Sequence, residues 1–154
     1  MTLHRVLEIT NDSKNLSRVR GEAAAVLAET AFDREMRNKI IVAVDEALAN
    51  VVEHAYGGGS GEVRVLFTLD ERTLVVRIQD QGVRFDPGER LKTAVDIHEH
   101  IRLGLKGGLG MFLMRRIMDD VVYNHDGPDF VNELVMVKNL PQPDLPAEDG
   151  DASS

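Results

Sequence analysis

Cysteine is absent from the 154-residue sequence, and so is any apolar run long enough to span a bilayer. Without thiols, neither a disulfide framework nor a thiolate zinc site can form. The N-terminal stretch MTLHRVLEIT also lacks the apolar core of a signal peptide. We therefore expect a cytoplasmic protein.

A surplus of basic residues is missing as well, because 18 Lys and Arg stand against 26 Asp and Glu, for a formal net charge of -8. Binding along a nucleic acid needs clustered basic side chains, so no nucleic acid is expected as the main partner. A basic protein surface or a metal-neutralised nucleotide remains compatible with this charge. The length and the 43% hydrophobic content fit one compact domain.

The N-terminal part of the chain predicts one strand and two helices. Residues 3 to 9 have the composition of a strand, and the polar residues 11 to 13 can cap a helix whose apolar positions recur from Leu16. Asp33 can cap a second helix, which ends at the glycines 57 to 59.

The period then changes from helical to two, which predicts a β-hairpin over residues 63 to 69 and 74 to 78 with a turn at 70 to 72. A long segment without a clean period follows, and such a loop is usually functional or disordered. Beyond it, one helix and two strands are expected at residues 108 to 118, 121 to 124 and 130 to 140.

This order of elements predicts an α+β fold, a two-layer sandwich in which helices cover one face of a mixed β-sheet. The domain is expected to comprise residues 1 to 140. Residues 141 to 154 are rich in proline, acid and serine, so we expect them to form a disordered tail.

Glu46, Asn50 and His54 stand four residues apart and form one polar row along the second helix. Mg²⁺ prefers oxygen ligands and shares its shell with water and substrate phosphates, so the Asn50 amide oxygen suits a magnesium site. Glu46, one turn earlier, could accept a proton from an attacking hydroxyl. Taken alone, such a row is more often the solvated face of a helix.

Asp80, in the stretch DQGVRFDPG, continues the phase of Leu74, Val76 and Ile78, so its carboxylate is predicted to point to the buried face. A buried carboxylate needs hydrogen-bond donors, which a ligand with an exocyclic amine would supply. Gly82 leaves room for a flat ring to approach the backbone. The alternative is that Asp80 only closes a turn through a hydrogen bond.

The stretch LKGGLGMFLMRR opens a helix with Gly107, Gly108 and Gly110. Backbone N–H groups at such a helix start can bind a phosphate. The stretch is neither a Walker A loop nor a full GxGxxG fingerprint. Alternatively, the glycines form a hinge that lets the preceding segment move.

Together, E-x-x-x-N-x-x-x-H from Glu46, D-x-G-x-x-F-D-P from Asp80 and G-G-x-G from Gly107 resemble the motifs of the GHKL ATPases, which include gyrase, a heat-shock chaperone, histidine kinases and mismatch-repair proteins. Within them the chain looks most like the stand-alone anti-sigma-factor serine kinases of bacteria. EALANVVEHAYG and GLGMFLMRRIMDDVVY carry this closer likeness. The resemblance covers residues 3 to 140 and implies a histidine-kinase-like ATPase domain.

The resemblance further implies ATP and Mg²⁺ as cofactors of a serine/threonine-protein kinase. In that family pattern Asn50 carries Mg²⁺, which bridges the ATP phosphates. Asp80 accepts from the adenine amino group, with Gly82 beside the ring, and Gly108 and Gly110 contact phosphates.

The same resemblance makes Glu46 the general base that takes the proton from a serine or threonine hydroxyl of a partner, and residues 85 to 107 a mobile ATP lid. The chain departs from the family twice. Lys106 stands where many relatives have an arginine, and it offers charge without a bidentate fork. Asn132 and Glu133 stand where relatives often carry threonines, so a hydroxyl contact to the nucleotide is missing there, and Glu133 could face outward.

On partners, the resemblance implies a STAS-type anti-sigma-factor antagonist and a sigma factor that is sequestered when the antagonist is phosphorylated. Arg18 matches a position that contacts partners in the family, although a solvated helix arginine would look the same. A homodimer is expected, without direct contact to nucleic acid or membrane.

Two alternatives stay open. One is the ATP-binding module of a two-component histidine kinase, but such a module normally follows a helical hairpin, and only about one strand and one helix precede the Asn50 helix here. The other is a non-catalytic regulator that uses ATP only to hold its lid closed, against which Glu46 argues.

Overall fold

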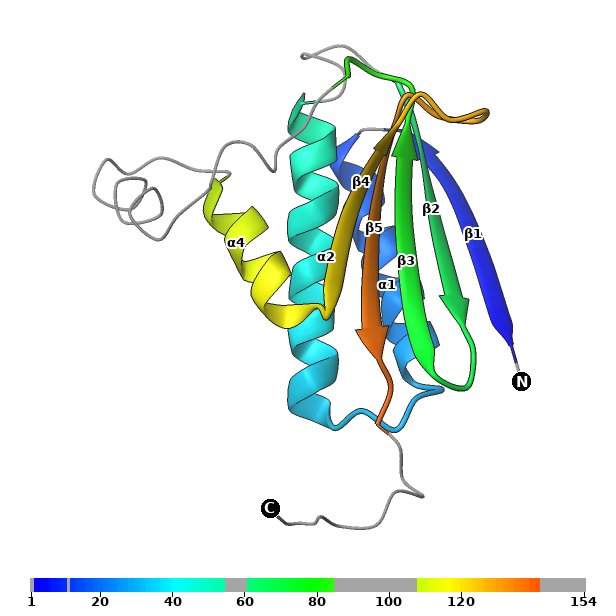
Figure 1. The fold of residues 1–154 in the computed structure, drawn as a ribbon, viewed down its shortest axis with the longest axis vertical. Coiled ribbons are helices and arrows are strands. Elements are labelled where there is room, and N and C mark those ends of the chain that lie inside the picture. The colour runs from blue at the N-terminus through cyan, green and yellow to red at the C-terminus, as the bar shows by residue number, and fades with distance from the viewer. Residues whose placement is uncertain (1, 11, 55–60, 85–107, 142–154) are drawn as a thin grey trace.

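The structure is a computed structural model that describes residues 2–10, 12–54, 61–84 and 108–141 (Figure 1). Within these residues one sheet contains five strands in the order β1-β2-β3-β5-β4. The strands are β1 (Leu3–Thr10), β2 (Glu62–Leu69), β3 (Thr73–Asp80), β4 (Asp120–His125) and β5 (Asn132–Asn139). The helices are the short 3-10 helix η1 (Ser13–Asn15), α1 (Leu16–Leu27), α2 (Arg34–His54) and α4 (Gly108–Ile117).

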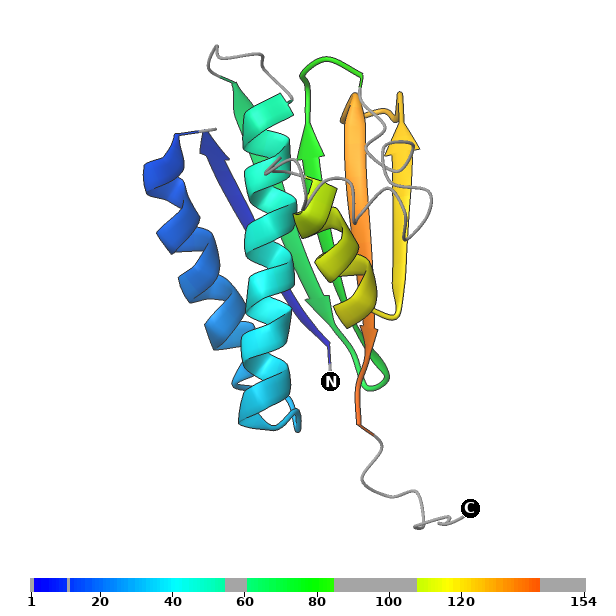
Figure 2. The ribbon, with the colours of Figure 1, turned by 90° about the vertical axis from the view of Figure 1, so that its left-hand side faces the viewer.

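The helices α1, α2 and α4 all lie on one face of the sheet (Figure 2), which confirms the two-layer α+β sandwich. The expectation of a mixed sheet was wrong for the described strands, because all four pairings between neighbours are antiparallel. The reason lies in the position of β5. Strands β3 and β4 run in the same direction, but β5 lies between them and pairs antiparallel with each.

The hairpin of β2 and β3 follows the predicted period of two, since every second residue of both strands is buried. Asp70 forms the turn: its Oδ1 accepts hydrogen bonds from the backbone N–H groups of Arg72 at 2.7 Å and Thr73 at 2.8 Å. These donors favour the charged form and lower the pKa of Asp70. The alternation directs one row of each strand toward the helices.

The core lies between the sheet and the helices, and the apolar residues of α2 recur at helical spacing. Met36 and Val51, near the two ends of this apolar row, are only half buried, while the centre of the row is fully enclosed. The buried core residues of α2 are Ile40, Ala43, Val44, Ala47 and Leu48, and those of the hairpin are Val63, Val65, Phe67, Leu69, Leu74, Val76 and Ile78.

The start of α1 differs from the prediction, in which residues 11 to 13 supplied the N-cap. The short helix η1 comes first, and Asn15 occupies the N-cap position without a capping bond from its side chain. Asp12 instead accepts a hydrogen bond from the backbone N–H of Lys14 at 2.9 Å, so it stabilises the tighter turn. The expected tail lies outside the described residues except for Pro141. No helix of the described part is long and apolar enough to cross a membrane.

Asp33 caps α2 as predicted, because its Oδ1 accepts a hydrogen bond from the backbone N–H of Met36 at 2.8 Å. We expect Asp33→Ala to lower the free energy of unfolding by about 1 kcal/mol, since the N–H group loses its acceptor. Asp33→Asn keeps an acceptor oxygen and should stay close to the parent. Urea denaturation followed by circular dichroism measures both, and equal losses in the two variants would contradict this cap.

Candidate functional site

Three elements that carry predicted site residues meet near one end of the sandwich. Strand β3 ends at Asp80, α2 brings Asn50 in its C-terminal half, and α4 begins at Gly108 beside that half of α2 (Figure 1). Segments that are far apart in the sequence therefore converge where the motifs predicted a common site.

Asn50 is buried, with only 8% of its surface exposed, so the polar row on α2 is not a solvated helix face at this residue. In the described part of the chain its amide makes no hydrogen bond, and a buried amide without a partner is costly. A cation that binds the amide oxygen would remove that cost. The donor chemistry of Asn50 thus fits a hydrated Mg²⁺ ion.

Glu46 lies one turn before Asn50 and is half buried. The neighbouring residue Asp45 is paired with Arg20 of α1, whose Nε lies 3.1 Å from Asp45 Oδ2. Glu46 itself forms no hydrogen bond or ion pair among the described residues, so its carboxylate remains available to a reacting group. The side chain of His54 lies outside the described residues.

Asp80 is buried at 3% exposure on the helix-facing side of β3, as its phase predicted. Its Oδ1 accepts two hydrogen bonds, from the Gly82 backbone N–H and from Asn132 Nδ2, both at 2.9 Å. Burial raises the pKa of Asp80, and these two bonds, which favour the charged form, only partly oppose the rise. Oδ2 receives no bond from the residues that the structure describes, so a ligand amine can meet it.

The turn bond between Gly82 and Asp80 is the alternative that the sequence left open, and the structure contains it. It does not exclude a ligand, because it occupies one carboxylate oxygen only. The bond from Asn132 was missed, although the register pairs Asn132 directly with Asp80. No local pattern in the sequence indicates this bond, because the two residues lie 52 positions apart.

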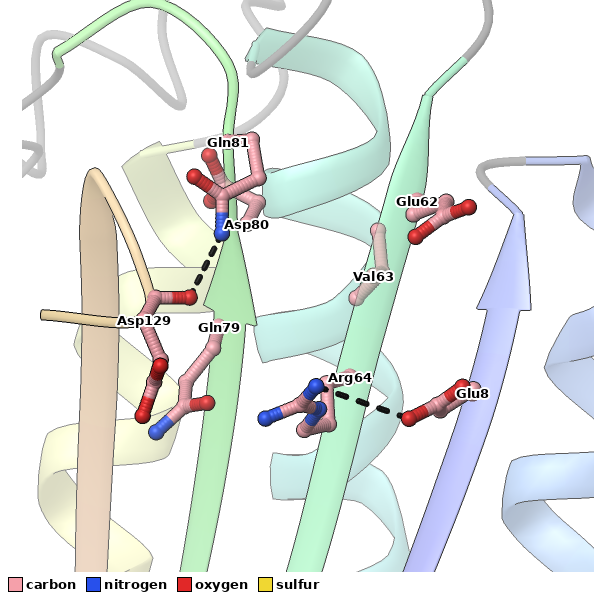
Figure 3. Close-up of a pocket in the computed structure, with 8 residues that line it drawn as sticks. All are labelled: Glu8, Glu62, Val63, Arg64, Gln79, Asp80, Gln81 and Asp129. Carbon is pink, nitrogen blue, oxygen red and sulfur yellow. Dashed lines mark hydrogen bonds and ion pairs between the residues drawn. The ribbon is translucent and has the colours of Figure 1, made fainter.

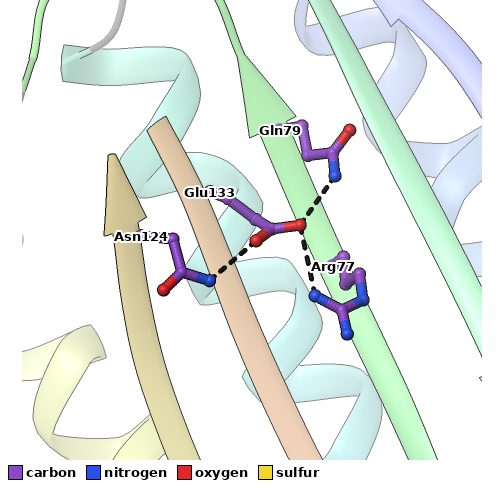
Figure 4. A network of polar contacts seen from close by, with 4 residues as sticks. All are labelled: Arg77, Gln79, Asn124 and Glu133. Carbon is purple, nitrogen blue, oxygen red and sulfur yellow. Dashed lines mark hydrogen bonds and ion pairs between the residues drawn. The ribbon is translucent and has the colours of Figure 1, made fainter. Parts of the chain in front are cut away.

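Glu133 faces away from the helices, since its neighbour Leu134 points into the core, yet it is only 4% exposed. Three side chains of β3 and β4 surround it (Figure 4). Its carboxylate accepts from Gln79 Nε2 at 2.6 Å, Asn124 Nδ2 at 2.8 Å and Arg77 Nη1 at 3.3 Å. Glu133 therefore ties three strands together on the face opposite the predicted site.

A pocket at the end of β3 lies partly on that opposite face (Figure 3). Four acidic residues line it, namely Glu8, Glu62, Asp80 and Asp129. The pocket also contains Arg64, which pairs with Glu8 at 3.5 Å. The phosphates of a nucleotide would meet mostly negative charge there, so we expect them to lie outside this pocket.

The structure describes only some of the other predicted residues. Gly108 and Gly110 lie in the first turn of α4, as the sequence suggested. Lys106, Gly107 and the predicted lid lie outside the described residues. Arg18 is exposed on α1, where its Nη1 lies 3.4 Å from Asn15 Oδ1, so it is accessible to a partner.

Comparisons with known proteins match most of the chain. The family model described as the histidine kinase-like ATPase domain matches residues 9–138. Proteins named Serine-protein kinase RsbW from Bacillus cereus (strain AH187) and Bacillus thuringiensis (strain Al Hakam) are each 31% identical over 123 residues, or 78% of this chain and 76% of theirs. The protein of that name from Bacillus anthracis (strain CDC 684 / NRRL 3495) is 30% identical over the same shares. The family match spans the whole site, from the polar row to Asn132.

Asp80→Asn should not lower the stability of the protein at neutral pH. The variant keeps an oxygen that can accept both bonds and removes a charge whose burial is unfavourable. Because the folded-state pKa of Asp80 is raised, the parent loses stability as the pH rises from the ordinary Asp value through the raised one. Melting temperatures measured from about pH 4 to pH 8 should therefore favour the variant increasingly. A variant that melts well below the parent at neutral pH would show that ionised Asp80 stabilises the fold.

Proposed function

This chain belongs to the histidine kinase-like ATPase domain family, and we propose that it is a serine/threonine-protein kinase and anti-sigma factor. In this proposal it binds MgATP and phosphorylates a STAS-type anti-sigma-factor antagonist on serine or threonine. The sigma factor is sequestered while the antagonist is phosphorylated. The proposed domain comprises residues 1 to 140, and residues 141 to 154 form an acidic tail outside it.

The buried amide of Asn50, which has no hydrogen-bond partner among the described residues, carries the proposal. A core position on a helix normally holds an apolar side chain, and a polar one there is stable only with a partner. A cation that also binds phosphate oxygens supplies that partner. We assign Asn50 as the protein ligand of Mg²⁺ and as a binding residue for the nucleotide.

The remaining binding residues are proposed on β3, on the turn after it and at the start of α4. Asp80 offers its Oδ2 to the adenine amine. Gly82 has no side chain, so it leaves room for the adenine ring beside the turn. We assign Gly108 and Gly110, at the start of α4, to the phosphates, because backbone N–H groups at a helix N-terminus favour an anion. Lys106 would add a positive charge near the terminal phosphate.

Glu46 is the proposed catalytic residue. When ATP is bound, it supplies the phosphoryl group, and the protein contributes mainly position and charge. Glu46 receives the proton of the attacking hydroxyl, so that the oxygen can bond to phosphorus as the bond to ADP breaks. Its position one helical turn from Asn50 places base and metal ligand on one row.

The partner surface is assigned to the exposed part of α1 around Arg18, and the chain is proposed to act as a cytoplasmic homodimer. The named relatives are serine-protein kinases, which supports a protein substrate. Neither a membrane nor a nucleic acid is needed for this activity.

Glu46→Gln should bind ATP as the parent does but transfer phosphate about 100-fold more slowly or worse, because general-base catalysis commonly contributes that much. Single-turnover transfer from labelled ATP to STAS-domain proteins of the same genome measures the rate, and calorimetry measures the affinity. Glu35→Gln, at the other end of α2 in an exposed ion pair with Lys39, is the matched control. Transfer at the parental rate in Glu46→Gln would remove Glu46 from the mechanism.

Asp80→Asn should weaken ATP binding by roughly 10- to 100-fold, the usual worth of a hydrogen bond to a charged group. With the asparagine oxygen held by Gly82 and Asn132, its amide N–H₂ would face the adenine amine, so donor would meet donor. Titration calorimetry with ATP tests this expectation. Unchanged affinity would exclude Asp80 from the adenine site.

A further inference from the structure

Asn132 forms a bridge that neither its residue type nor its family position predicted. One side-chain nitrogen, Nδ2, donates to Asp80 Oδ1 at 2.9 Å and to the backbone carbonyl of Val83 at 2.8 Å. The amide group carries two N–H donors, so both bonds can form at once. Asn132 thus contacts both the last residue of β3 and the turn that follows it.

Hydrogen bonds hold the backbone around Asn132 in place. Asn132 is the register partner of Asp80 at the start of β5, and the adjacent Val131 N–H donates to the Asp80 carbonyl at 2.9 Å. Gln81 Nε2 also donates to the Asp129 carbonyl at 2.5 Å (Figure 3). Because the backbone on both sides is held, the Asn132 amide has little freedom to leave the Asp80 carboxylate.

The two hydrogen bonds make the two oxygens of the Asp80 carboxylate unequal. A lone carboxylate can rotate and offer either oxygen to a ligand or to a local donor. With Gly82 N–H and Asn132 Nδ2 both on Oδ1, the group is held in one orientation and Oδ2 is the oxygen left for a ligand amine. Such preorganisation saves the ordering cost when a ligand binds.

We propose that Asn132 is a specificity-determining positioning residue, which orients Asp80 toward an exocyclic amine and holds the Val83 turn against β5. The inference rests on the proposed function, because it presupposes that Asp80 receives the adenine amine. It adds that the preference for a 6-amino purine depends on a side chain that need not touch the nucleotide. A hydroxyl residue at this position could make only one of the two bonds, since it has one hydrogen to donate.

The test compares ATP with purine riboside triphosphate, which lacks the 6-amino group, in titrations of the full chain. The parent should bind ATP at least about tenfold more tightly, the effect of one good hydrogen bond. Asn132→Ala should lose most of this preference while its affinity for the analogue stays near the parental value. Asn139→Ala, exposed near the other end of β5, is the matched control and should keep the preference.

Asn132→Thr separates the two bonds and also serves if the alanine variant folds poorly. Its hydroxyl can donate to Asp80 but then not to Val83, so it should restore the preference for ATP if the Asp80 bond sets it. A preference equally reduced in the threonine and alanine variants would show that the Val83 bond is the decisive one and would overturn the orienting role.

Each failure has a distinct signature. No ATP binding by the parent would refute the proposed function. A parent that binds ATP but does not prefer it over the analogue, or an Asn132→Ala variant that keeps the full preference, would refute the inference and leave the kinase proposal intact.

Discussion

The period of two along β3 is the constraint on which the site depends. The same alternation that places Leu74, Val76 and Ile78 in the core places a carboxylate, Asp80, on the buried side at the strand end. A shift of one residue in register would move it to the opposite face. The packing of the hairpin therefore determines where the candidate site can lie. The surrounding hydrogen-bond donors then stabilise a carboxylate that the fold has already buried.

Local patterns in the sequence were sufficient for most of the fold. Helical spacing predicted α1 and α2, alternation predicted the hairpin, and the Asp33 cap formed as expected, because these features depend on residues close together in the chain. The antiparallel sheet was not predicted, since the insertion of β5 between β3 and β4 depends on the competition between distant strands. The first turn before α1 was missed for a different, local reason, because Asp12 and Asn15 favoured a tighter helix there.

The positions of some candidate site residues in the fold were also predictable. Asp80 could be found because its own strand sets its phase, and the burial of Asn50 agrees with the idea that its row is more than a solvated face. The partner of Asp80 could not, because Asn132 reaches it only through a strand pairing that spans 52 positions of the sequence. Glu133 shows the opposite case. It faces outward, as the sequence allowed, but neighbours from two other strands bury it on the outer face.

The central place of β5 also bears on how the protein is made. It is the last described strand in the chain, yet it pairs on both sides, so β4 joins the sheet only through it. During synthesis the hairpin of β2 and β3 can form early, whereas Asp80 stays without its side-chain partner until β5 has left the ribosome. A nascent chain that stops before β5 therefore has an open sheet edge and an incomplete carboxylate site, so neither the completion of the sheet nor ligand recognition can precede the synthesis of β5.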